Sequence, residues 1–219
     1  LFEHNGGIKA IAQHEFTQYF PKESWVEHDG LEIWNTQLKA INEVIEKAQI
    51  NIEQIHAMGI TNQRETTLIW NRKTGIPIHN AIVWQDRRTS GICDSLKKEG
   101  KEKQFYDKTG LILDAYFSGT KIKWILDQDP KIREAAENGE LAFGTIDSWL
   151  IWNLTKGSVH VTDVTNASRT LLFNIHTLEW DDELLITLGI PKGLLPNVVS
   201  CSEKVGETDL SIFNHPIPI

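Results

Sequence analysis

Apolar residues recur at helical spacing directly after Asp29, a residue type that favours a helix N-cap. Glu32 stands three residues further on, where a capping-box partner is expected. Apolar side chains then line one face of a helix at intervals of three or four residues: Trp34, Leu38, Ile41 and Ile45. The pattern predicts an amphipathic helix that begins at Asp29.

Later stretches show the same helical pattern. It covers residues 88–98, 102–108, 118–126, 146–154 and 180–189. Ser118 is expected to cap the third of these helices, because a hydroxyl can accept a hydrogen bond from the first free N–H groups. Gly189 followed by Pro191 is typical of a helix end.

Short apolar runs between turn residues predict strands. These runs are residues 8–12, 55–60, 66–70, 81–84 and 141–144. Strands come first and mixed helices follow, which indicates an α/β or α+β domain rather than a repeat array. No linker rich in Gly, Ser or Pro interrupts the chain, so one compact domain is expected.

Composition narrows the class of protein. The formal net charge is −8 and the pI is about 5.5, whereas nucleic-acid domains usually carry clustered Lys and Arg. No apolar run approaches the roughly 20 residues that span a bilayer, and no export signal is visible at the start. Cys93 and Cys201 suit neither a metal site nor a disulfide framework. We therefore expect a cytoplasmic protein, with no nucleic-acid partner and no indication of membrane association.

The densest polar cluster is the stretch 59–67, where an apolar run leads into uninterrupted polar residues before the next strand. Neighbouring side chains on a strand face opposite ways, so Arg64 and Glu65 share a site only where the backbone leaves the strand. A polar hairpin bend would explain this pattern. The functional interpretation is an Arg donor and a Glu acceptor arranged for a hydroxylated ligand.

Other polar stretches carry weaker signals. Residues 84–88 follow a buried strand, and open α/β sheets bind ligands beyond such strand ends. Residues 116–121 combine aromatic and hydroxyl groups, which a helix cap with a packed ring would also explain. Residues 162–169 lack a nucleophile–base pair. Zinc spacings, a P-loop and a Rossmann fingerprint are all missing from the chain.

Taken together, the clusters resemble the sugar and polyol kinases of the FGGY family. Part of that family's first motif is present, with Tyr116, Ser118, Lys121 and Trp124 in order. Longer peptides resemble the family members that phosphorylate glycerol: residues 25–29, 59–67, 80–85, 162–169 and 173–177. The resemblance covers nearly the whole chain.

The resemblance implies a ribonuclease-H-like α/β fold, as in actin and hexokinase, with a mixed sheet flanked by helices. It also implies roles for four residues in glycerol binding. Arg64 and Glu65 would bind hydroxyls, Tyr116 would add a hydroxyl contact, and Trp84 would pack against the carbon skeleton. The implied reaction is phosphoryl transfer from Mg-ATP to a terminal hydroxyl of glycerol. A homodimer or a homotetramer is compatible with the resemblance.

The resemblance further implies that residues 1–219 form the N-terminal, substrate-binding domain, truncated at both ends, with the C-terminal ATP-binding domain absent. The family's phosphate-contacting hairpin would precede Leu1, and its catalytic aspartate would follow Ile219. No catalytic, cofactor-binding or metal-ligating residue is therefore expected within the chain, and the isolated chain is expected to be inactive. ATP and Mg²⁺ would serve the longer parent protein.

Two alternatives remain open. The parent protein could act on another polyol or a short sugar, which a panel of polyols would separate from glycerol. The chain could also be a non-catalytic actin-like module, since one fold serves many functions. Such a module has no need for Arg64, Glu65, Trp84 and Tyr116 to converge, so their dispersal would favour it.

Overall fold

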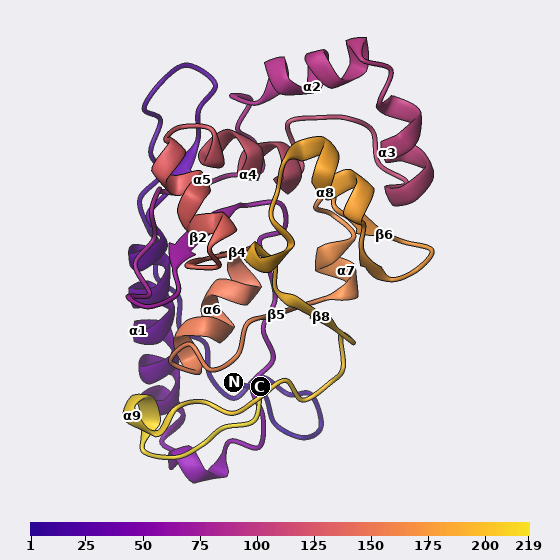
Figure 1. Cartoon of the computed structure of the whole chain (residues 1–219). Coiled ribbons are helices and arrows are strands. Elements are labelled where there is room, and N and C mark those ends of the chain that lie inside the picture. The colour runs from indigo at the N-terminus through magenta and orange to yellow at the C-terminus, as the bar shows by residue number, and fades with distance from the viewer.

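The computed structural model describes residues 1–219, in which helices alternate with short strands (Figure 1). The strands are β1 (Glu27–His28), β2 (Leu68–Asn71), β3 (Ala81–Ile82), β4 (Leu141–Gly144), β5 (Val161–Asp163), β6 (Phe173–Asn174), β7 (Glu179–Trp180) and β8 (Asn197–Val199). The α-helices are α1 (Gly30–Ala48), α2 (Ser90–Lys98), α3 (Glu102–Thr109), α4 (Ser118–Leu126), α5 (Pro130–Glu137), α6 (Ile146–Leu154), α7 (Val164–Ala167), α8 (Asp182–Leu188) and α9 (Leu210–Phe213). Two 3₁₀ turns are η1 (Ile52–Gln54) and η2 (Lys192–Leu194).

The strands pair in both directions. β2 and β4 are antiparallel, with Leu68 opposite Gly144, and β5 and β8 are parallel. β1 pairs with β3, and Ile82 of β3 also bridges to Thr67, which leads into β2. The expected mixed sheet is thus reduced to four two-stranded sheets, of which the bridge between Thr67 and Ile82 joins only the β1–β3 pair to the β2–β4 pair.

Helix α1 begins where the sequence predicts. The Asp29 carboxylate accepts hydrogen bonds from the backbone N–H groups of Leu31 and Glu32, which caps the helix. Glu32 does not complete a capping box, because its carboxylate accepts hydrogen bonds from Thr17 instead. Figure 1 shows α1 beside α6, and the Trp149 indole of α6 donates a 2.7 Å hydrogen bond to the carbonyl of Gly30.

Helix α4 supports the segment that contains Tyr116. Ile122, Ile125 and Leu126 are buried in the main apolar core, where α4 lies close to α5 and α8. The cap differs from the prediction, because Phe117 is the N-cap and the hydroxyl of Ser118 points instead to the carbonyl of Glu65, 3.4 Å away.

Two predicted strands are wrong. Residues 8–12 form only one bridge, between Phe2 and Ile8, and the side chain of Ile11 is exposed. The apolar residues of 55–60 pack their side chains against α1 and α6, but the backbone forms no ladder. The apolar run thus reflects the partial burial of its side chains and not the pairing of its backbone in a strand.

Two further features concern membrane-spanning helices and disulfide bonds. No helix has the length and apolarity needed to cross a membrane. Cys93 and Cys201 are both free thiols, one buried and one exposed.

Candidate functional site

Glu65 lies in the turn that precedes β2 and has left-handed backbone geometry, with a φ of 63°. This region is strained for a residue with a side chain, so surrounding contacts must hold it. The carbonyl oxygen of Glu65 accepts hydrogen bonds from the Lys121 ammonium (3.0 Å) and the Thr67 hydroxyl (3.1 Å). These contacts fix the backbone at this position.

The side chain of Glu65 forms an ion pair. Arg169 Nε donates a 2.7 Å hydrogen bond to Oε1 of Glu65, whose side chain is only 5% exposed. The second carboxylate oxygen, Oε2, has no hydrogen-bond partner within the chain and is not fully buried. One oxygen of this carboxylate therefore remains free to accept a hydrogen bond from a ligand.

Aromatic rings lie next to this carboxylate. Trp84 follows β3 and Tyr116 precedes α4, and their ring centroids are 5.5 Å apart. The guanidinium carbon of Arg169 lies 5.7 Å from the Tyr116 ring and 5.0 Å from the Phe117 ring. Arg169 thus contacts both Glu65 and Tyr116, and Tyr116 contacts Trp84, so three of the four residues singled out from the sequence belong to one connected cluster.

Arg64 is the fourth residue. It shares the turn with Glu65, is exposed, and makes no hydrogen bond or ion pair with the rest of the chain. Its five N–H donors therefore remain available. Arg64 lies near the site because it directly precedes Glu65 in the chain.

Lys121 is completely buried behind the site, and its ammonium donates hydrogen bonds to the carbonyls of both Glu65 and Tyr116. Burial lowers the pKa of Lys121 to about 7, against the opposing attraction of the Asp86 and Glu65 carboxylates. One side chain thereby fixes the backbone of two candidate binding residues relative to each other.

The polar residues after Trp84 have structural partners. The Asp86 carboxylate accepts hydrogen bonds from the backbone N–H of Val26 and from Arg88. The guanidinium of Arg88 lies 3.7 Å from the Trp25 ring centroid and 4.7 Å from that of Trp124. Asp86 and Arg88 therefore stabilise the segment that carries Trp84.

The stretch 162–169 supplies hydrogen-bond donors to two carboxylates, those of Asp147 and Glu65. Thr162 and Asn166 donate hydrogen bonds of 2.7 Å and 3.1 Å to the buried Asp147 carboxylate. Burial raises the pKa of Asp147. The end of the stretch supplies Arg169. Sequence reasoning missed Arg169 as a site residue, because its partner Glu65 lies far away in the chain.

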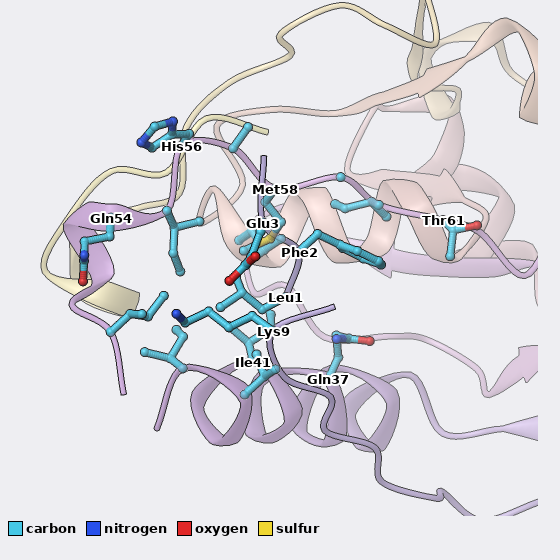
Figure 2. A pocket seen from close by; sticks show the side chains of 18 of the residues that line it. Leu1, Phe2, Glu3, Lys9, Gln37, Ile41, Gln54, His56, Met58 and Thr61 are labelled. Atoms are coloured by element: carbon cyan, nitrogen blue, oxygen red, sulfur yellow. The ribbon is translucent and has the colours of Figure 1, made fainter. Parts of the chain in front are cut away.

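A cavity of about 670 Å³ lies elsewhere, between the start of the chain, α1 and residues 50–61. Figure 2 shows Leu1 and Phe2 between Ile41 of α1 and Met58. None of the four candidate binding residues lines it, and its lining is mostly apolar. The cavity is therefore separate from the cluster formed by Glu65, Arg169 and Tyr116.

Comparisons with known proteins identify the family. A model of the N-terminal domain of the FGGY family of carbohydrate kinases matches residues 1–216. A glycerol kinase of Borreliella afzelii is 61% identical over 219 residues, which are 100% of this chain and 44% of that protein. The chain therefore spans less than half the length of this curated relative.

Solved structures agree with the family match. The ADP complex of Plasmodium falciparum glycerol kinase is 37% identical, with a TM-score of 0.87, over 94% of this chain and 42% of that one. A ligand-bound xylulose kinase of Lactobacillus acidophilus has a TM-score of 0.87 at 23% identity, over 99% of this chain and 44% of that one, and shows the fold alone. The expected actin- and hexokinase-like α/β fold is confirmed. The chain belongs to the FGGY family of carbohydrate kinases.

Proposed function

We propose that the complete gene product is an ATP-dependent glycerol kinase, which forms sn-glycerol 3-phosphate, and that this chain supplies the glycerol pocket. The observation that carries the proposal is the 61% identity to a glycerol kinase over all 219 residues. The series of contacts from Glu65 to Arg169, from Arg169 to Tyr116 and from Tyr116 to Trp84 supports it.

Glycerol carries three hydroxyls, each a donor and an acceptor, on a short carbon chain. In this proposal the free Oε2 of Glu65 accepts a hydrogen bond from one hydroxyl, and the unpaired guanidinium of Arg64 donates to another. The Tyr116 hydroxyl adds a further contact. Trp84, half-buried against Tyr116, provides the apolar wall for the carbon chain.

The nucleotide and Mg²⁺ are part of the proposed reaction but not of this chain's site. Residues 1–219 contain no group of three His, Cys, Asp or Glu side chains that could hold a metal ion. We propose that Mg²⁺ enters with ATP. Positioning of the glycerol hydroxyl is the contribution of the residues described above.

We further propose that residues 1–219 alone do not transfer phosphate, since the chain spans only 44% of the length of the glycerol kinase that it matches. The test is ADP release by the isolated chain with Mg-ATP and glycerol. Release at the rate of the protein-free control is expected. Glycerol-dependent release above that rate would overturn this part of the proposal.

Calorimetric titration of glycerol into the complete gene product tests the pocket. Saturable binding is expected, with a large loss of affinity in Arg64→Ala, because that substitution removes a hydrogen-bond donor to the ligand. Arg133→Ala is the matched control, since Arg133 pairs with Asp127 on another part of the chain. Absence of binding by the wild-type protein would overturn the proposal.

Two other assignments are weaker. A kinase for another polyol or short sugar shares the fold, and relative turnover of different substrates separates it from the proposed enzyme. A non-catalytic module would leave the contact between Glu65, Arg169 and the two rings without a use. We also propose a cytoplasmic location, because the reaction consumes ATP. We propose in addition that the complete gene product forms a homodimer or a homotetramer, which analytical sedimentation would test.

A further inference from the structure

We propose that Arg169 is a positioning residue for substrate binding, which holds the Glu65 carboxylate so that its Oε2 faces a substrate hydroxyl. This inference rests on the proposed function and deepens it. Arg169 acts through Glu65, so it is distinct from the residues proposed to touch glycerol.

The backbone of Glu65 is already fixed. Lys121 and Thr67 both donate to its carbonyl oxygen, and these bonds maintain its left-handed geometry. None of these contacts reaches the carboxylate, which could still rotate about the side-chain torsions. The only hydrogen bond to the carboxylate within the chain is the one from Arg169 Nε to Oε1. Arg169 therefore decides which way the free oxygen points.

Arg169 is itself well placed for this task. Its guanidinium lies within 5.7 Å of the Tyr116 ring and 5.0 Å of the Phe117 ring, a range in which cations and aromatic faces attract. Its side chain is 33% exposed, whereas that of Glu65 is 5% exposed. The two rings and the ion pair together hold the guanidinium in place.

The contact has a consequence for the pocket as a whole. The same guanidinium orients the proposed hydroxyl acceptor, Glu65, and borders the proposed aromatic wall at Tyr116. Loss of Arg169 would leave a buried carboxylate without its cation, and buried charges without partners reorient toward water or become protonated. Either change removes the oriented acceptor while leaving Arg64, Trp84 and the rest of the fold in place.

Steady-state kinetics of the complete gene product test the inference. Arg169→Met is expected to raise the KM for glycerol on the order of tenfold or more, because an oriented charged acceptor is lost. The kcat should fall less than the KM rises. Arg169→Lys retains the charge without the planar Nε donor, and is expected to recover part of the affinity. Arg133→Met, which removes a similarly exposed arginine paired with Asp127, should change KM less than about twofold.

A double-mutant cycle separates action through Glu65 from a general structural role. If Arg169 works only through Glu65, adding Arg169→Met to Glu65→Gln should lower kcat/KM by less than about threefold further. Additive losses would overturn the inference, as would an unchanged glycerol KM in Arg169→Met. Should Arg169→Met fail to fold, the cycle is run with Arg169→Lys. Failure of the proposed function looks different, because the wild-type protein would then show no glycerol turnover.

Discussion

The ammonium of Lys121 donates a 3.0 Å hydrogen bond to the carbonyl of Glu65, and the same nitrogen lies 2.7 Å from the carbonyl of Tyr116. A single fully buried side chain thus connects the turn before β2 to the segment before α4. Both connected residues are proposed to bind glycerol. Their separation is therefore set by a buried contact within the chain.

Lys121 gives a prediction for the pH dependence of stability. Its pKa in the folded chain is lowered from 10.5 to about 7, so between these values the unfolded chain binds more protons than the folded chain. The free energy of unfolding should therefore increase with pH across this window. Relative to Lys121→Met, the wild-type chain should gain stability between pH 7 and pH 9. The neutral amine retains two N–H groups, enough for both carbonyls.

Urea unfolding of both chains at several pH values measures this difference. Other titrating groups are common to the two chains and cancel in the comparison. A stability difference that stays constant, or that shrinks as the pH rises, would contradict the buried position of the ammonium.

Glu65→Gln replaces one acceptor oxygen by an amide donor and removes the charge that pairs with Arg169. We expect kcat/KM for glycerol in the complete gene product to fall about 10- to 100-fold, as for other hydrogen bonds to charged groups. Glu183→Gln serves as a control, because Glu183 is exposed on α8 and pairs with Lys108. A loss of less than about twofold would remove Glu65 from the proposed site.

His160 gives a second prediction about pH. Its Nε2–H donates to the carbonyl of Phe143 and its Nδ1 accepts from Arg72, so only the neutral ring satisfies both contacts. Burial lowers its pKa from 6.5 to about 4. The unfolded chain thus takes up the proton first, and stability should fall as the pH drops from 6.5 towards 4.

The matched variant is His160→Gln, whose amide can donate to Phe143 and accept from Arg72 but cannot be protonated in this range. Thermal unfolding at pH 7 and pH 4.5 should show a greater loss for the wild-type chain, up to about 3 kcal/mol. Equal losses in both chains would show that His160 does not contribute to acid sensitivity.

Gly144 of β4 gives a prediction about packing. A Cβ at this position would lie 2.5 Å from the Cβ of Ser148 and 2.9 Å from the Trp70 ring. Gly144→Ala should therefore destabilise the chain by about 1–3 kcal/mol, the usual cost of overpacking. Gly91→Ala is the control, since nothing lies within 4 Å of its added Cβ. Equal unfolding midpoints for the two variants would contradict the packing of β4 against α6.

Elements with strong local signals were predictable from the sequence. The Asp29 cap and the apolar face after it predict α1, and the short apolar run 141–144 predicts β4, whose four residues are all buried. The run 55–60 shows the limit of this reasoning. Its apolar side chains pack against α1 and α6 while its backbone forms no ladder, and the sequence pattern reports burial rather than backbone pairing.

The site shows the same limit. Arg64 and Glu65 stood out because they are adjacent in a polar stretch, and Trp84 and Tyr116 because of their motifs. Arg169 did not, because its partner is 104 residues away and its neighbours are ordinary polar residues. Its role depends on a tertiary contact, which no local spacing reports.

The central claim is that this site selects glycerol, and relative turnover of two substrates tests it most directly. The kcat/KM of the complete gene product is measured with Mg-ATP for glycerol and for a pentulose such as xylulose. We expect glycerol to be preferred by several orders of magnitude, because the polar groups of the site are proposed to pair with its hydroxyls. A pentulose preferred by a similar margin would contradict the account and assign the chain to another sugar kinase of the family.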